Sequence, residues 1–201
     1  CEQALAAGVP SVAFTDHLDF ITWTDGDRIA AENLDPHRYY RMHLLDVTGY
    51  LAAIDECRQR YPDLRIFSGA EIGEAHMWAA SASALAAVAG FERILGSLHA
   101  IPFDGRLTAT DELFRLLPAD EVMRRYLGEV VELIEGSDLF QVLAHLDFPR
   151  RMWPWSAGPY EERAFEAEYR AVLRALAASD RVLEVNTKSP LVSTELVRWW
   201  R

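Results

Sequence analysis

The sequence has few positive charges, few cysteines and no long apolar run. Lys and Arg number 20 against 31 Asp and Glu, and the resulting net charge of −11 would repel a nucleic-acid backbone. The two cysteines, Cys1 and Cys57, are too few for a disulfide framework and lie in no CxxC motif, which favours the reducing cytoplasm. The most apolar stretch, residues 81–90, is too short to span a bilayer, and the first residues do not resemble a signal peptide. We therefore expect neither a nucleic-acid nor a membrane partner.

Motifs of several enzyme classes are also missing. No GxGxxG or GxxxxGK[ST] follows the first apolar run, so neither a dinucleotide-binding fold nor a P-loop is supported. No GxSxG is present and neither cysteine follows a predicted strand, so no protein nucleophile is expected. The chain does have 201 residues, of which 50% are hydrophobic and 25% charged, and this is typical of one soluble globular domain.

Short apolar runs alternate with longer amphipathic segments along the chain. The runs are as long as strands and lie at Ser11–Thr15, Arg65–Gly69, Arg93–Ser97, Phe140–Ala144 and Val182–Asn186. Helical faces are predicted at Tyr40–Ile54, Val122–Leu133 and Phe165–Leu176, with an Ala-rich helix at Met77–Ala89 and a short first helix that ends near Gly8. Strands joined by such helices run parallel, which leaves an open doubly wound sheet or a closed β/α barrel. Long loops are expected at Asp16–Pro36, Ala100–Thr110 and Leu146–Pro159.

Polar residues able to bind a metal follow four of the five predicted strands. They are, in strand order, Asp16 and His17, then Glu71, then His99, then His145 and Asp147. The carboxyl ends of parallel strands meet at one edge, so these side chains should lie close together. Imidazole and carboxylate ligands suit zinc, iron or manganese, and one carboxylate can bridge two ions, so a multinuclear hydrolytic site is predicted. The remaining histidines, His37, His43 and His76, are expected on solvated helix faces.

The five strand ends together resemble the PHP domain (polymerase and histidinol phosphatase) family, and its histidinol-phosphatase-like members in particular. The matching strings are Thr15-Asp16-His17, Gly69-Ala70-Glu71, Gly96-Ser97-Leu98-His99, Ala144-His145-Leu146-Asp147 and Glu184-Val185-Asn186-Thr187. Each string is short, but their order and spacing cover nearly the whole chain. The resemblance implies a distorted, seven-stranded, TIM-like β/α barrel that holds up to three divalent metal ions.

By the same resemblance, Glu71 bridges two ions, His99 and His145 complete one of those sites, and His17 binds the third ion. Zinc is favoured by imidazole-rich ligands, although iron and manganese accept the same set. The family's His-x-His on the first strand and Asp-x-His on the last are missing from this chain. About five of the seven strands are therefore covered, and the single domain at residues 1–201 is expected to be incomplete at both ends.

The implied reaction is hydrolysis of a small phosphomonoester, with histidinol phosphate as the first candidate, by a metal-bound water. Phosphate binding needs positive charge besides the metals, so Arg150 or Arg151, just after His145, is the candidate, and Lys188 is a weaker one. Two alternatives remain: a metal-dependent amide or ester hydrolase on the same barrel, and a catalytically inactive PHP domain used for binding.

Overall fold

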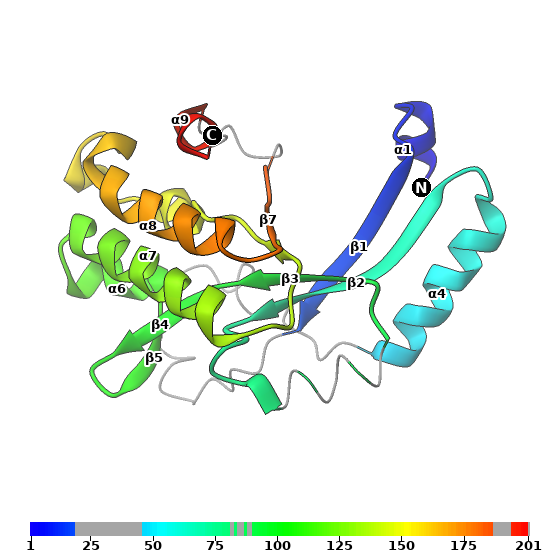
Figure 1. Cartoon of the computed structure of the whole chain (residues 1–201), viewed down its shortest axis with the longest axis horizontal. Helices are drawn as coiled ribbons and strands as arrows, with labels where there is room; N and C mark the ends of the chain where they lie inside the picture. Colours follow the sequence, from blue (N-terminus) through cyan, green and yellow to red (C-terminus); the bar gives the residue numbers. More distant parts are fainter. Residues whose placement is uncertain (19–45, 81–82, 84–86, 88–89, 187–193, 201) are drawn as a thin grey trace.

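A parallel β-sheet forms the centre of the computed structural model, which describes residues 1–18, 46–80, 83, 87, 90–186 and 194–200 (Figure 1). The strands are β1 (Ser11–Leu18), β2 (Arg65–Gly73), β3 (Arg93–Ser97), β6 (Val142–Leu143) and β7 (Val182–Leu183). They are hydrogen-bonded in the order β1-β2-β3-β6-β7, and all neighbours are parallel. All five strands predicted from the apolar runs are thus confirmed, although β6 and β7 are only 2 residues long.

The register of the sheet determines which side chains meet near its carboxyl edge. His17 pairs with Glu71 across β1 and β2, and Glu71 pairs with Leu95 across β2 and β3. Residues that pair across neighbouring strands share a face of the sheet, because side chains alternate along each strand. His17 and Glu71 therefore lie on the same face, one residue before the last pair of that ladder, Leu18 and Ile72.

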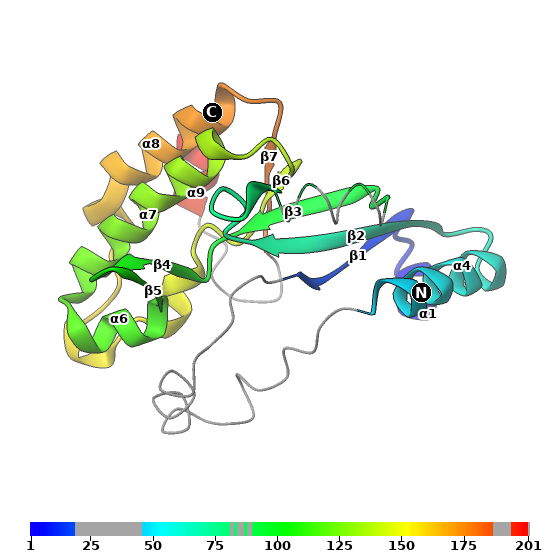
Figure 2. The ribbon, with the colours of Figure 1, turned by 90° about the horizontal axis from the view of Figure 1, so that it is seen from below.

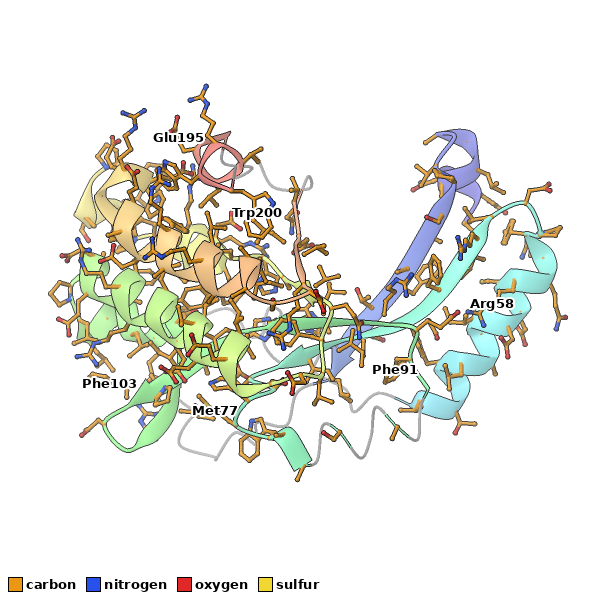
Figure 3. All side chains as sticks on the ribbon, in the orientation of Figure 1. Arg58, Met77, Phe91, Phe103, Glu195 and Trp200 are labelled. Carbon is orange, nitrogen blue, oxygen red and sulfur yellow. The ribbon has the colours of Figure 1, made fainter. Side chains whose placement is uncertain are left out.

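Two long helices, α7 (Ala119–Gly136) and α8 (Glu166–Ala177), pack side by side and cover part of the sheet (Figures 1 and 2). Both predicted faces are confirmed, because Val122, Tyr126, Val130 and Leu133 of α7 and Tyr169, Val172 and Leu176 of α8 are buried. They join the sheet residues Ile72, Ile94 and Leu143 in one apolar core. Figure 3 shows side chains filling the space between these helices and the sheet.

A third helix, α4 (Val47–Arg60), packs on β2 through a smaller cluster of Ile54, Leu64 and Ile66. The helix begins after Asp46, whose carboxylate accepts a hydrogen bond of 3.1 Å from the Gly49 N–H, as an N-cap should. The predicted face started earlier, but its first part lies outside the described residues, as does most of the helix expected at Met77–Ala89.

The short terminal helices are α1 (Glu2–Ala6) and α9 (Thr194–Trp199). Helix α1 ends as predicted: Gly8 has φ +68°, and the N–H groups of Gly8 and Val9 donate to the carbonyls of Leu5 and Ala4. Helix α9 packs on α8 through the rings of Trp199 and Tyr169, whose centroids are 5.9 Å apart.

Two of the segments expected as loops contain regular structure. Residues 100–109 form an antiparallel hairpin of β4 (Ala100–Phe103) and β5 (Arg106–Ala109), followed by α6 (Thr110–Leu116), so the loop prediction was wrong there. The turn is Asp104-Gly105, and both residues have positive φ, as a two-residue hairpin turn requires. The chain after β6 forms the 3₁₀ turns η1 (Phe148–Met152), η2 (Trp155–Ala157) and η3 (Glu162–Phe165).

The five parallel strands of the described residues form an open sheet with β1 and β7 at its edges, and β4 and β5 form a separate two-stranded sheet. The fold is therefore α/β with a five-stranded parallel sheet. None of the helices within the described parts of the chain is long and apolar enough to cross a membrane.

Candidate metal centre

The Glu71 carboxylate, near the end of β2, is the centre of the candidate site. Its Oε1 atom lies 2.9 Å from His145 Nε2, 3.2 Å from His99 Nε2 and 3.8 Å from His17 Nδ1. The carboxylate is 12% exposed, and the exposed fractions of the three imidazoles rise from 8% for His145 to 20% for His99 and 56% for His17. The structure thus brings together the four residues that the sequence nominated as metal ligands.

The three imidazoles form a row beside Glu71. Ring centroids are 5.6 Å apart for His17 and His99, and 5.3 Å apart for His99 and His145. The Phe148 ring, at the start of η1, lies 5.0 Å from the His99 ring and 5.1 Å from the His145 ring. Phe148 therefore forms an apolar wall against the two less exposed imidazoles.

Burial alone would raise the pKa of the Glu71 carboxyl. Hydrogen bonds with His145 and His99, together with the charge of the surrounding imidazoles, outweigh burial and hold this pKa well below its usual range. Glu71 is consequently ionised at neutral pH and presents a full negative charge to the histidines.

Further acidic groups are buried around this centre. Glu74 is fully buried, and Asp147 is 9% exposed. The hydroxyl of the fully buried Tyr126 senses their charge, because its pKa is raised first by burial and then by Asp147 and Glu74. Glu74 contacts the His99 main chain and Asp147 follows His145 by two residues, so negative charge lies near the imidazoles, as is expected where a cation binds.

The donor set fits a divalent metal ion. His17, Glu71 and His99 each offer one ligand atom, and these atoms lie within 4.8 Å of one another. His145 adds a fourth donor through its contact with Glu71, and its buried Nδ1 has no hydrogen-bond partner within the described residues. Three imidazoles with a carboxylate are suitable ligands for zinc, and also for iron or manganese. Division of these ligands among separate ions stays a prediction.

The structure distinguishes the two candidate arginines, both in η1. The Arg150 guanidinium is 23% exposed, lies 2.5 Å from Glu162 Oε1 and stacks over the Tyr160 ring at 5.1 Å. Arg151 is exposed, and its guanidinium lies 5.6 Å from the centroid of the Phe148 ring. Arg151 is therefore the arginine that contacts Phe148, the ring that packs against His99 and His145. The third candidate, Lys188, lies outside the described residues.

One histidine prediction was wrong. The His76 side chain is only 10% exposed, and its Nε2 lies 2.9 Å from Glu129 Oε1 on α7. Its Cβ packs against Gly136 at the end of the same helix, where an added Cβ would lie 3.0 Å away. The sequence places His76 just after a strand, and the turn there directs its ring against α7 instead of into solvent. His37 and His43 lie outside the described residues.

Sequence reasoning also missed two carboxylates that contact the main chain of the histidines. Glu74 accepts hydrogen bonds from the His99 and Ala100 N–H groups, and Glu184 accepts one from the His145 N–H. Glu184 lies within one of the matched strings, but its contact with His145 follows only from the pairing of β6 with β7, which the sequence does not reveal.

Known proteins share this arrangement of elements. The PHP domain family profile matches residues 1–188. A histidinol-phosphatase of Lactococcus lactis is 25% identical over 194 residues, which cover 92% of this chain, and the chain spans only 63% of that relative's length.

Two crystal structures have the same fold. The first, from Lactococcus lactis, is a histidinol phosphate phosphatase in complex with zinc, L-histidinol and phosphate; it superposes with a TM-score of 0.77 at 21% identity over 99% of this chain and 72% of its own. The second, from Listeria monocytogenes and assigned as a histidinol phosphatase, also has a TM-score of 0.77, at 18% identity over 98% of this chain and 81% of its own. Because the family profile extends over residues 1–188 of 201, the chain belongs to the PHP domain family.

Proposed function

We propose that this protein is a metal-dependent phosphoric monoester hydrolase that acts on a small phosphorylated substrate, with histidinol phosphate as the first candidate. The observation that carries the proposal is the meeting of three imidazoles at one buried carboxylate, Glu71, near the carboxyl end of a parallel sheet. The Lactococcus lactis relatives support the reaction, because they are named as histidinol phosphatases and one binds zinc, L-histidinol and phosphate.

The residues that would hold the ions are His17, Glu71, His99 and His145. Bound zinc would supply Lewis-acid chemistry, which makes water a nucleophile near neutral pH and neutralises charge on phosphoryl oxygens. Glu71 is suited to its position because it stays ionised despite being buried. The Phe148 ring covers His99 and His145 and limits the access of bulk water to them.

Arg151 would bind the phosphate. Its guanidinium is exposed beside Phe148 and can form two parallel hydrogen bonds with phosphate oxygens. Arg150, by contrast, supports the loop through Glu162 and Tyr160.

The complete domain would be a single seven-stranded, TIM-like barrel. The described sheet supports this, since β1 and β7 have open edges and the large side chains Val182 and Val185 near one edge are 55% and 53% exposed. Cys1 and Cys57 are both free thiols, which is consistent with a cytoplasmic enzyme.

The test is hydrolysis by protein stripped with a chelator and then reloaded with zinc, manganese or iron. We expect phosphate release from histidinol phosphate only after reloading, competition by inorganic phosphate, and no turnover of carboxylic esters or amides. The Glu92→Ala variant, changed at the opposite end of the sheet, serves as a control and should retain activity. If reloaded protein binds metal but cleaves an amide or an ester instead, the phosphatase assignment is wrong; if it binds metal and cleaves nothing, a binding role is favoured.

A further inference from the structure

The main-chain N–H of each histidine in the centre donates to a carboxylate. The His99 and Ala100 N–H groups donate to Glu74 Oε1 at 2.6 and 2.9 Å. The His145 N–H donates to Glu184 Oε2 at 2.6 Å. The His17 N–H donates to the adjacent Asp16 at 2.9 Å, in an exposed local contact. The contacts made by Glu74 and Glu184 each join the ends of two neighbouring strands, so they fix one strand end relative to the next.

Glu74 and Glu184 use the same arrangement. The Glu74 N–H donates to the carbonyl of Ser97, and the Glu74 carboxylate accepts a hydrogen bond from the N–H of His99, two residues after Ser97. Likewise, the Glu184 N–H donates to the carbonyl of Leu143, and the Glu184 carboxylate accepts a hydrogen bond from the N–H of His145, two residues after Leu143. In a regular parallel ladder, the residue that donates the first hydrogen bond accepts the second one with its own main-chain carbonyl. A side-chain carboxylate thus replaces the carbonyl where the strand ends.

The backbone around Glu74 explains the replacement. Glu74 has φ +47°, a conformation that is uncommon outside glycine, and its carbonyl accepts from the Met77 N–H at 2.9 Å instead of from the neighbouring strand. The chain turns away at this point, and the fully buried side chain continues the ladder by two hydrogen bonds. Hydrogen bonds to an ionised acceptor are shorter and stronger than those to a carbonyl.

We propose that Glu74 and Glu184 are positioning residues for the metal centre: each holds the main chain of one imidazole ligand so that its Nε2 faces Glu71. The proposal rests on the proposed function, since it assumes that His99 and His145 bind the metal. Each carboxylate also adds negative charge close to the bound cation, which favours cation binding through space. Asp16 contributes least, because its contact with His17 is local and exposed.

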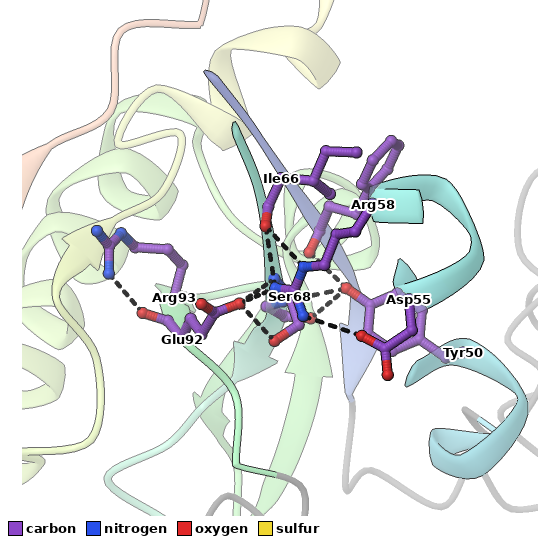
Figure 4. A network of polar contacts seen from close by, with 9 residues as sticks. Tyr50, Asp55, Arg58, Ile66, Ser68, Glu92 and Arg93 are labelled. Atoms are coloured by element: carbon purple, nitrogen blue, oxygen red, sulfur yellow. Dashed lines mark hydrogen bonds and ion pairs between the residues drawn. The ribbon is translucent and has the colours of Figure 1, made fainter. Parts of the chain in front are cut away.

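The structure supplies a matched control at the amino end of β3, away from the histidines. Glu92 accepts a hydrogen bond of 2.9 Å from the Ser68 N–H, and its own N–H donates to the Ser68 carbonyl (Figure 4). This acid joins the start of β3 to the middle of the neighbouring strand β2, but its side-chain partners are Ser68 and Arg58 and not the histidines. A general loss of strand-end support should therefore affect the Glu92 variant as well.

The experiment compares Glu74→Ala, Glu74→Gln, Glu184→Ala and Glu184→Gln with Glu92→Ala in the intact protein. Zinc dissociation constants are measured by competition with a chelating dye, on protein shown to be folded by its circular dichroism, and kcat and KM are measured after reloading. We expect the Ala variants at Glu74 and Glu184 to weaken zinc binding about 10- to 100-fold, the range found for groups that orient metal ligands. The Gln variants keep an acceptor oxygen and should recover part of the loss, even where an Ala variant does not fold.

If the Glu74 and Glu184 variants bind zinc as tightly as Glu92→Ala does, and the wild-type protein is active, the positioning role is overturned. The proposed function then stays intact. Lower melting temperatures without a change in the zinc dissociation constant lead to the same conclusion, because a purely structural acid affects stability only. A wild-type protein that binds no divalent ion overturns both proposals, and it does so before any variant is made.

Discussion

Replacing Arg150 and Arg151 separately tests the phosphate assignment most directly, because the two residues are adjacent but have different surroundings. The Arg150 guanidinium pairs with Glu162, which is 16% exposed, and covers the Tyr160 ring. The Arg151 guanidinium lies over the Phe148 ring, which in turn contacts His99 and His145. Each variant therefore serves as the control for the other.

The expected effects differ in kind. Hydrogen bonds to charged groups contribute about 1.5–3 kcal/mol, and at an exposed position such as Arg151 the lower value applies. Arg151→Ala should therefore raise KM for a phosphomonoester about tenfold and weaken inhibition by free phosphate equally. Arg150→Ala leaves a mostly buried Glu162 without its guanidinium and should lower the free energy of unfolding by about 1–3 kcal/mol.

The assays are steady-state kinetics with and without inorganic phosphate, thermal unfolding, and metal content for both variants. We expect normal metal content in both, a KM effect confined to Arg151→Ala, and a decrease of several degrees in melting temperature confined to Arg150→Ala. If Arg151→Ala keeps its KM and its sensitivity to phosphate, the phosphate is bound elsewhere. If Arg150→Ala instead raises KM at unchanged stability, the two assignments are reversed.

Three further outcomes follow from the described contacts. His145→Ala should lose bound metal and about two orders of magnitude or more in kcat/KM while keeping its circular dichroism spectrum, and normal turnover at full metal content would contradict the ligand assignment. Because the pKa of Glu71 is lowered in the fold, its ionised form stabilises the metal-free protein at pH values above the ordinary glutamate pKa of about 4.3, and this stability is lost as the pH falls below that value. In acid unfolding curves, the stability of Glu71→Gln should therefore depend less on pH than that of the wild-type protein. Arg181→Lys should lower the free energy of unfolding by about 2–4 kcal/mol in urea titrations, because one ammonium group cannot replace a guanidinium that donates to the carbonyls of Ile134, Ser137 and Phe140; an unchanged midpoint would show that these bonds contribute little.

The sheet and its helices could be predicted because burial leaves a regular pattern. Ile72 of β2, Ile94 of β3 and the spaced apolar residues of α7 and α8 pack in one core, whereas most of the β1 run is exposed and only Leu18 joins that core. The hairpin at residues 100–109 was missed although Asp104-Gly105 is a typical turn, because its strands are only 4 residues long and follow His99 directly. The glycine in the Gly-Ser-Leu-His string has a packing reason, since a Cβ at Gly96 would lie 2.5 Å from the Phe140 ring.

The position of the site could be predicted, but its detailed contacts could not. Strand ends converge by topology, so His17, Glu71, His99 and His145 could be grouped from their order alone. Side-chain direction inside a turn depends on backbone angles that no periodicity reveals. For this reason His76 was wrongly expected in solvent, and the sequence could not tell which arginine of η1 contacts Phe148 and which pairs with Glu162.

The acidic groups around the centre connect the fold to the chemistry. Glu71 is 12% exposed, Glu74 is fully buried and Asp147 is 9% exposed, while Glu184, just after β7, accepts a hydrogen bond from the His145 N–H. Main-chain N–H groups donate to Glu74 and Glu184, and imidazoles hydrogen-bond to Glu71, which holds the pKa of the Glu71 carboxyl well below its usual range despite burial. Neutral donors do not cancel the combined charge, however, and like charges held close in a poorly solvated region repel one another. A divalent cation among the imidazoles removes that repulsion, so the same carboxylates that shape the strand ends also make metal binding favourable.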